Sequence, residues 1–203
     1  KLFNERIILS NKEIKNTKLI NTLKFIKKIN NDNPITFFEV TTAAAFYLFS
    51  KEKADFLILE TGLGGRLDAT NVIDNSLIDI ITPISIDHQE FLGQNILGII
   101  DEKLGIIKKG SHIIISKQKK LVLSHIKKKL KTNKNHKLFF EKNFTIIDKD
   151  KKTFILKYNK IEKIFKKPSL LGEHQVENAS TAIAAILKLN QLGYSISEKD
   201  INK

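Results

Sequence analysis

Hydrophobic residues along the chain follow two patterns, one typical of amphipathic helices and one typical of buried strands. Residues 36–52 (TFFEVTTAAAFYLFSKE) place apolar side chains at helical intervals and predict a helix. Three further helices are expected, within 95–110, at about 119–131 and within 173–193. The first of these is expected to end near Gly105 or Gly110, and the last at Gly193, since glycine commonly terminates helices.

Short, continuous apolar runs indicate strands that are buried on both faces of a parallel sheet. These runs are 55–60 (DFLILE), 77–85 (LIDIITPIS) and 112–116 (HIIIS). Their alternation with helices predicts right-handed βαβ units. Residues 137–168 differ, because two β-rich runs flank a polar turn at 148–152, which favours an antiparallel edge of the same sheet. The expected fold class is therefore α/β, a mostly parallel sheet flanked by helices with an antiparallel part near 137–168.

Composition adds limits on size, location and completeness. A chain of 203 residues that is 41% hydrophobic is long enough to bury the core of one large domain. It has no cysteine, which excludes disulfides and thiolate metal sites and suits a cytoplasmic location. No apolar run approaches the roughly 18 residues of a membrane span, so no membrane partner is expected. The chain begins with Lys1 and contains no methionine, so we expect a piece of a longer protein.

The net charge of +13 suits a nucleic-acid partner, because basic surfaces release counterions from phosphate backbones. However, only two of the 35 basic residues are arginines, and the one dense basic run, 126–137, has the period of a solvated helix face. No nucleic-acid partner is therefore expected. A non-catalytic, basic nucleic-acid-binding module is the alternative from another class.

Candidate chemistry lies just beyond two of the predicted strands. Glu60 ends the first strand, and Asp87 and His88 follow the second. Ligands of open parallel sheets bind beyond the carboxyl ends of the strands. Mg²⁺ accepts a carboxylate readily and an imidazole less readily, so a magnesium site is one interpretation. The other is that Glu60 and Asp87 cap the following turns while His88 is a partly buried hydrogen-bonding residue.

A glycine-rich turn follows the first of these strands. Its glycines, which let the backbone turn sharply or approach a ligand, are Gly62, Gly64 and Gly65. Arg66 comes directly after them. A planar guanidinium suits a carboxylate or phosphate in a way that lysine does not. A bound anion and a structural bridge to Asp68 are both open as its partner.

Five motifs, in the same order along the chain, resemble the folylpolyglutamate synthase/dihydrofolate synthase family, a branch of the Mur-type ligases. They are TFFEVTTAAAF (36–46), LETGLGGRLDATNV (59–72), ITPISIDHQEFLG (81–93), DEKLGIIKKG (101–110) and LLGEHQVENASTAIAAI (170–186). The resemblance covers nearly the whole chain and implies a P-loop-like Mur ligase central domain. It also implies an ATP-dependent ligase that adds L-glutamate to dihydropteroate or to a folate, through an acyl phosphate formed on the acceptor carboxylate.

The resemblance assigns catalytic and metal-binding roles to Glu60, His88 and Lys103. Glu60 and His88 match the family's Mg²⁺ ligands, and Lys103 matches a lysine that the family carbamylates. An ammonium cannot ligate a cation, whereas a carbamate supplies two anionic oxygens. The alternative for Lys103 is a counter-charge to Glu102 or to phosphate. Leu104 stands where the family usually has alanine.

The same comparison places the pterin acceptor against two stretches of the chain. They are Thr36, Phe37, Phe38 and Glu39, and Leu67, Asp68 and Ala69. A carboxylate such as Asp68 can accept two parallel hydrogen bonds from a 2-aminopyrimidinone edge, and an aromatic ring offers a stacking face. The competing interpretation makes Thr36 and Glu39 a capping box and the two phenylalanines core, and both roles can coexist.

For ATP, the resemblance implies that Asn178 contacts the base, since an amide can donate and accept at once. The family's P-loop and its C-terminal glutamate-binding domain are not among the 203 residues. We therefore expect residues 1–203 to be an incomplete ATP-binding central domain with little ligase activity of its own. The parent enzyme is expected to be a monomer that acts on small molecules. Another Mur-type amino-acid ligase is the nearest alternative.

Overall fold

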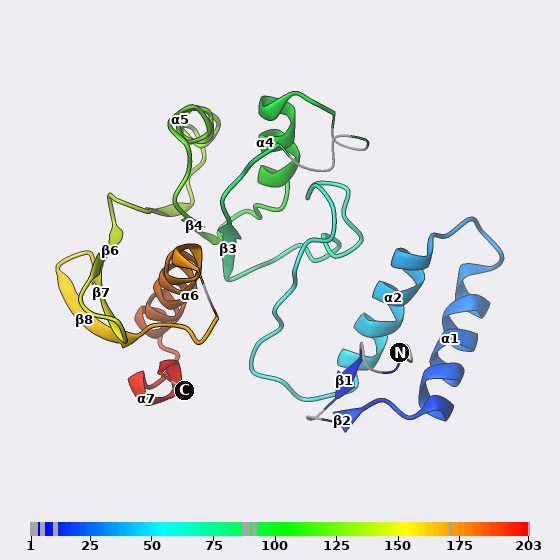
Figure 1. The fold of residues 1–203 in the computed structure, drawn as a ribbon. Coiled ribbons are helices and arrows are strands. Elements are labelled where there is room, and N and C mark those ends of the chain that lie inside the picture. Colours follow the sequence, from blue (N-terminus) through cyan, green and yellow to red (C-terminus); the bar gives the residue numbers. More distant parts are fainter. Residues whose placement is uncertain are drawn as a thin grey trace. The chain divides into compact units, whose positions relative to one another are not determined.

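The computed structural model describes residues 4, 7–9, 12–86, 90, 93–170 and 172–202. The chain forms two compact units, shown as a ribbon in Figure 1. The first consists of Lys1–Gly62 and Asp68–Val72, and the second of Leu63–Leu67 and Ile73–Lys203. In the described part, no helix is long and apolar enough to span a bilayer.

The first unit contains two helices and a short hairpin. The hairpin pairs β1 (Ile8–Leu9) with β2 (Lys12–Glu13), and the helices are α1 (Asn16–Asn30) and α2 (Phe37–Phe49). A small core gathers Ile7, Ile14, Leu19 and Leu48. α2 confirms the helix predicted at 36–52, whereas α1 was not predicted.

The capping box predicted at the start of α2 is confirmed. The Thr36 hydroxyl accepts a hydrogen bond from the Glu39 amide at 3.2 Å, and the Glu39 carboxylate accepts one from the Thr36 amide at 2.8 Å. The Thr36 hydroxyl also donates to this carboxylate at 2.7 Å. These bonds to Thr36 lower the pKa of Glu39. They satisfy amide groups that the first helical turn leaves without a partner.

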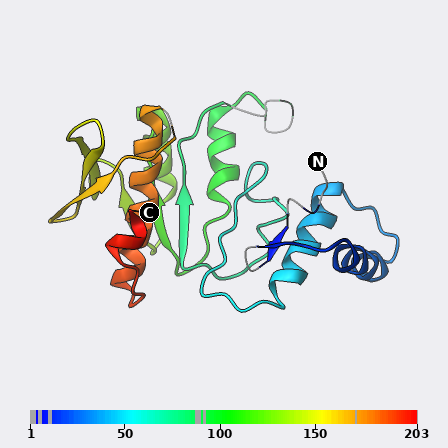
Figure 2. The ribbon, with the colours of Figure 1, turned by 60° about the horizontal axis from the view of Figure 1, so that its bottom comes forward.

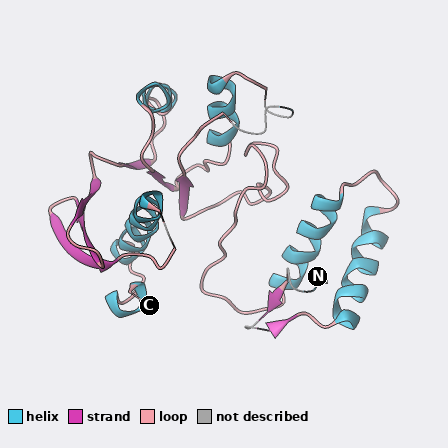
Figure 3. Ribbon diagram, viewed as in Figure 1, coloured by secondary structure: helices cyan, strands magenta, loops and turns pink. Residues whose placement is uncertain are grey.

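The prediction of a buried strand at 55–60 is wrong. All six residues are exposed, Ile58 by 90%, and the segment runs as an extended loop outside every strand of the described part (Figure 3). An apolar run suits a strand, but a strand also needs a neighbouring chain to complete its ladder of hydrogen bonds. Glu60 therefore ends an extended loop here and not a strand.

The second unit is built on a parallel sheet with the strand order β3-β4-β5. Its strands are β3 (Ile78–Ile81), β4 (His112–Ile115) and β5 (His136–Phe139). Helices α4 (Ile96–Leu104) and α5 (Lys120–Lys129) cover one face, and α6 (Glu173–Gln191) covers the other (Figure 1). Figure 2 shows α6 running alongside the strands. The strands predicted within 77–85 and at 112–116 and the three predicted helices are thus confirmed.

Alternation along β4 explains why the sheet needs helices on both faces. Ile113 and Ile115 are fully buried in the core formed with α4 and α5, and Ile114 is buried in the core formed with α6. Successive side chains of a strand point to opposite faces, so a continuous run of isoleucines requires two apolar layers.

The β-rich region near 137–168 forms a separate antiparallel sheet and is not an edge of the parallel one. The sheet has the order β6-β7-β8, with β6 (Phe144–Asp148), β7 (Thr153–Tyr158) and β8 (Ile161–Lys166). β5, which opens this region, joins the parallel sheet instead. Phe144, Phe154 and Phe165 are buried in the core beneath α6, and this packing draws the hairpins away from the parallel sheet. A short helix, α7 (Glu198–Ile201), follows α6.

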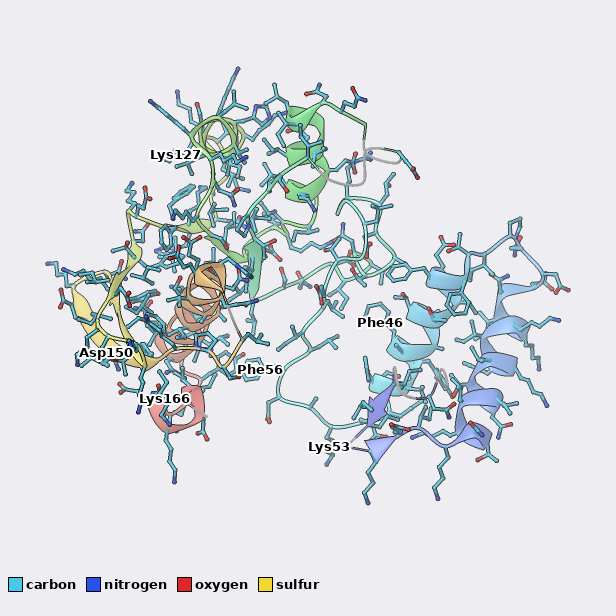
Figure 4. All side chains as sticks on the ribbon, viewed as in Figure 1. Phe46, Lys53, Phe56, Lys127, Asp150 and Lys166 are labelled. Carbon is cyan, nitrogen blue, oxygen red and sulfur yellow. The ribbon has the colours of Figure 1, made fainter. Side chains whose placement is uncertain are left out.

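The first four residues of the dense basic run, 126–129, lie at the end of α5, and the rest lead through a turn into β5. Ile126 and Leu130 are buried, while Lys127, Lys128 and Lys129 are exposed. Figure 4 shows the side chains of α5 extending outward, with Lys127 labelled. Lys129 pairs with Asp101 of α4 at 2.6 Å. The lysines at 127–129 therefore form the solvated face of a helix, whereas the later lysines of the run follow it.

A buried carboxylate, Asp79, joins β3 to the turn before β4. It accepts hydrogen bonds from the Ser76 hydroxyl at 2.6 Å, the Lys108 amide at 2.9 Å and the Ser111 hydroxyl at 2.6 Å. Asp79→Ala removes an acceptor shared by these three donors, so we expect it to lower the free energy of unfolding by about 2–4 kcal/mol. Asp74→Ala, at an exposed position, is the control and should change stability by less than about 0.5 kcal/mol. Urea denaturation measures both, and equal effects would contradict the role of Asp79.

The lowered pKa values of two histidines indicate how the free energy of unfolding depends on pH. His112 and His136 begin β4 and β5, and burial, followed by the charge of Lys188, lowers the pKa of each below 6.5. The unfolded chain then takes up protons at a higher pH than the folded chain does. The stability from these two residues is complete above about pH 6.5 and decreases as the pH falls through that value.

His112→Gln removes one of the two titrating groups. We expect this variant to lose less stability between pH 7.5 and 5.5 than the unmodified protein, because only one of the two groups with a lowered pKa remains. Thermal unfolding across this range measures the loss. Identical pH dependence in the two proteins would show that His112 does not contribute.

Candidate functional site

The glycine-rich turn is seated on the last turn of α4. The Arg66 amide donates to the Glu102 carbonyl at 2.9 Å. A Cβ atom on Gly65 would lie 2.6 Å from this carbonyl oxygen and 3.0 Å from Cα of Lys103. A Cβ atom on Gly105 would lie 2.4 Å from Cβ of Arg66 and 2.8 Å from its Cα. Glycine is required on both sides because the two backbones are in direct contact.

Arg66 contacts a carboxylate of the chain itself. Its Nη2 and Nε atoms donate to Oε1 of Glu102 at 2.8 Å and 3.2 Å. A bound anion and a bridge to Asp68 were the two alternatives left open by the sequence, and the structure shows a bridge to Glu102. The pair is largely exposed, so it contributes on the order of 1 kcal/mol or less to stability. The main effect of the bridge between Arg66 and Glu102 is to hold the glycine turn at a fixed position along α4.

Lys103 is placed by this contact. It lies in the last turn of α4, next to the carbonyl that holds Arg66, and it is half-buried. Among the described residues its ammonium forms no hydrogen bond or ion pair, and Glu102 is engaged by Arg66. The neighbouring Leu104 packs into the core between α4 and α5. The Lys103 amine is thus available at a position set by the glycine turn.

The structure does not show the three predicted magnesium ligands, Glu60, His88 and Lys103, in one site. Glu60 is exposed and belongs to the first unit, whereas Lys103 belongs to the second. Asp87 and His88 lie outside the described residues. Within the described ranges, no three His, Cys, Asp or Glu side chains are grouped closely enough to hold a metal. The site formed by Glu60, His88 and Lys103 stays a prediction, and its carboxylate and carbamate oxygens are ligands that Mg²⁺ accepts.

The predicted acceptor-binding residues lie mostly in the first unit, and Leu67 belongs to the second. The alternative in which both phenylalanines are core is wrong, because Phe37 is 72% and Phe38 46% exposed. Phe38 packs against the glycine turn, where a Cβ atom on Gly62 would lie 2.7 Å from its Cζ. Ala69 is half-buried and Leu67 is exposed. Exposed aromatic faces at the start of α2 are suited to stacking on a flat ligand.

Asp68 is buried and organises its own loop. Its Oδ2 atom accepts from the Gly62 amide at 3.0 Å, and its Oδ1 atom accepts from the amide and the hydroxyl of Thr70 at 2.9 Å and 2.6 Å. A carboxylate has about four acceptor positions, and at least three are used here. Two parallel hydrogen bonds to a pterin edge would require these loop bonds to be exchanged. The pterin contact of Asp68 stays a prediction.

Asn178 is exposed near the start of α6. Its amide donates to the Gln175 side chain at 3.4 Å, and Gln175 contacts Nε2 of His174 at 3.1 Å. The Asn178 amide therefore retains donor and acceptor capacity for a ligand, as contact with an adenine edge requires.

Two contacts that the sequence did not predict hold this part of α6 beside the carboxyl end of β4. Lys117 pairs with Glu177 at 2.6 Å, and the Thr181 hydroxyl donates to the Ser116 hydroxyl at 3.1 Å. Ligands of parallel sheets bind at this edge. The partners are 60 and 65 residues apart, so no local pattern could have paired them.

Comparison with known proteins agrees with this geometry. The family model described as "Mur ligase middle domain" matches residues 6–186. Dihydrofolate synthase/folylpolyglutamate synthase of Bacillus subtilis (strain 168) is 34% identical over 93% of this chain and 46% of the relative. The protein of the same description from Escherichia coli (strain K12) is 30% identical over 98% of this chain and 45% of the relative.

Solved structures show the same similarity. The apo form of L. casei FPGS superposes with a TM-score of 0.85 at 27% identity, over 99% of this chain and 52% of that one. E. coli FolC in complex with DHPP and ADP superposes with a TM-score of 0.83 at 27% identity, over 99% and 46%. The predicted α/β fold and the resemblance to folylpolyglutamate synthases are thereby confirmed. The chain spans about half the length of the curated relatives it matches. Because the family model covers most of its length, the chain belongs to the Mur ligase middle domain family.

Proposed function

We propose that the protein containing this chain is an ATP-dependent ligase that joins L-glutamate to the carboxyl group of dihydropteroate or of a folate. The observation that carries the proposal is the glycine turn seated on α4 beside Lys103, in a chain whose relatives are dihydrofolate/folylpolyglutamate synthases. ATP supplies the phosphoryl group that activates the acceptor carboxylate, and the glutamate amine then displaces phosphate to form the amide.

In this proposal, different residues of the chain bind the metal ion, ATP and the acceptor. Glu60, His88 and a carbamylated Lys103 would hold Mg²⁺, which would compensate charge on the transferred phosphoryl group, and Asn178 would orient the adenine. The exposed rings of Phe37 and Phe38 stack on the pterin, and the loop containing Asp68 borders it. In carbamylation the Lys103 ammonium first loses a proton, and the neutral amine then adds CO₂ and releases a second proton, which changes a cation into an anionic ligand. In this proposal the protein is a cytoplasmic monomer whose partners are small molecules.

The proposal is tested by assaying the full-length protein for ligation. Formation of ADP should require both L-glutamate and a pteroate or folate acceptor, and mass spectrometry should show the acceptor extended by glutamate. Glu60→Ala should abolish the product while circular dichroism remains unchanged. ATP turnover driven by a nucleotide-sugar acceptor would identify another Mur-type ligase. Steeply salt-dependent binding to nucleic acid without ligation would identify a basic binding module.

A further inference from the structure

Two imidazoles stand side by side at the amino-terminal edge of the parallel sheet. His112 and His136 are direct partners in the register of β4 and β5, and their ring centroids are 5.6 Å apart at an interplanar angle of 67°. Each lies two residues before a side chain of the core beneath α6, Ile114 and Leu138. Residues two apart on a strand share a face, so both imidazoles face α6.

Lys188 of α6 completes the group. It is only 8% exposed, and in the described part of the chain its ammonium forms no hydrogen bond or ion pair. Its positive charge acts on both imidazoles. The other charged group that acts on His136 is Lys137, whose ammonium is held by the carbonyls of Asn133 and Asn135. The charges that bear on the two imidazoles are thus cationic.

His112 has a second unusual feature. Its Nδ1 atom is buried and is the one buried side-chain nitrogen or oxygen of the described residues without a hydrogen-bond partner. Native proteins seldom leave such atoms unsatisfied, and the exceptions indicate a missing water or ion. Lys188, although mostly buried as a residue, has no counter-ion among the described residues. Donors from three elements therefore gather where no acceptor of the described chain meets them.

We propose that His112, His136 and Lys188 form a binding site for a phosphate group. A tetrahedral dianion has acceptors enough for donors that approach from β4, β5 and α6, and its charge compensates the ammonium. A divalent metal bound by the two imidazoles is disfavoured because Lys188 lies beside them. His136 is exposed, so the group is reached from solvent.

This site is separate from the candidate ligase site. Thr181 of α6 contacts Ser116 after the carboxyl end of β4, whereas His112 begins that strand. Lys188 lies seven residues beyond Thr181, or about 10 Å along the helix. The phosphate site thus occupies the opposite edge of the sheet from the edge at which the family fold places its ligands. The inference does not depend on the ligase activity, since its readout is binding.

The test is phosphate titration of the full-length protein with ¹³C-labelled histidine rings, observed by NMR. Inorganic phosphate should shift the ring signals of His112 and His136, assigned from His112→Gln and His136→Gln. Lys188→Met should weaken this binding about tenfold or more, since it removes a charge-assisted donor. Lys128→Met, which removes the same charge from the exposed face of α5, should leave the affinity unchanged. Because both signals belong to this edge of the sheet, phosphate bound elsewhere is not counted.

A folding control keeps the test decisive. Without phosphate, Lys188→Met should unfold at the same or a higher temperature, because it removes an uncompensated cation, while it loses the stabilisation by phosphate seen in the unmodified protein. Equal binding of glycerol 3-phosphate would identify a metabolite's terminal phosphate as the ligand, and binding of inorganic phosphate alone would identify the free ion. Signals of His112 and His136 that do not respond to either compound, or a response that Lys188→Met retains, would overturn the proposal.

Discussion

Lys103→Ala in the full-length protein is expected to reduce the rate of glutamate ligation by about 100- to 1,000-fold, with little change in stability. The side chain forms no hydrogen bond or ion pair in the described part of the structure, so its loss removes no structural contact of that kind. Its proposed carbamate would be a ligand of the metal that compensates charge on the transferred phosphoryl group. A discontinuous assay of folate extension, run beside urea denaturation, measures the two effects separately.

Lys109→Ala is the matched control for this variant. Lys109 is exposed, follows the same helix and carries the same charge. It should leave both the rate and the stability unchanged. A Lys103→Ala enzyme with nearly normal activity would show that the amine is a counter-charge and not a metal ligand.

The second large effect is expected at Gly105. Gly105→Ala would place a Cβ atom 2.8 Å from the backbone Cα of Arg66, so the glycine turn must move away from α4. We expect the unfolding free energy to fall by about 1–3 kcal/mol from this overpacking. Ligation should fall about 10- to 100-fold in addition, because the turn fixes the backbone around Lys103 and small displacements of a catalytic group are costly.

Gly98→Ala tests the same helix without the contact. Apart from its chain neighbours and the backbone of α4, no atom of the described residues lies within 4 Å of its would-be Cβ, so alanine should stabilise α4 by about 0.5–1 kcal/mol and leave ligation unchanged. Thermal unfolding and the ligation assay, applied to both variants, compare crowding at the turn with glycine content alone. If Gly105→Ala behaved like Gly98→Ala, the seating of the turn on α4 would not matter.

Local sequence patterns correctly predicted the elements that are specified by neighbouring residues, such as helix caps and glycine stops. The helix beginning at Phe37 has its capping box in the sequence, and α6 ends before Gly193, which adopts a φ of 98° that favours glycine. The isoleucine run of β4 required two covering layers, which the structure supplies. The helix α1 was not predicted, although Leu19, Leu23 and Ile26 have helical spacing.

Pairing between distant segments could not be predicted in the same way. The apolar run at 55–60 has the composition of a buried strand, but composition does not provide the neighbouring strand that a ladder requires. Residues 137–168 were correctly predicted to be β-rich. Whether they would join the parallel sheet or form a new one depended on the packing of phenylalanines under α6. Tertiary contacts decided both cases.

In the candidate site, too, local sequence patterns were predictable and contacts between distant residues were not. The importance of the GLGGR turn was evident from its residues, and its partner was not, because Glu102 lies 36 positions from Arg66. Asp68 was predicted to accept hydrogen bonds from the pterin. In the structure, most of the acceptor positions of its carboxylate are occupied by Gly62 and Thr70. Residue types indicated the chemistry, and only the fold showed which groups are already engaged.

We propose that Glu60, His88 and a carbamylated Lys103 share one divalent ion. A crystal structure of the full-length protein, grown with Mn²⁺ in place of Mg²⁺ and with an ATP analogue, tests it through the anomalous scattering of manganese. We expect one manganese peak within about 2.0–2.3 Å of a Glu60 oxygen, a His88 nitrogen and a carbamate oxygen on Lys103. A peak held by other residues, with these three side chains directed to separate regions, would contradict it.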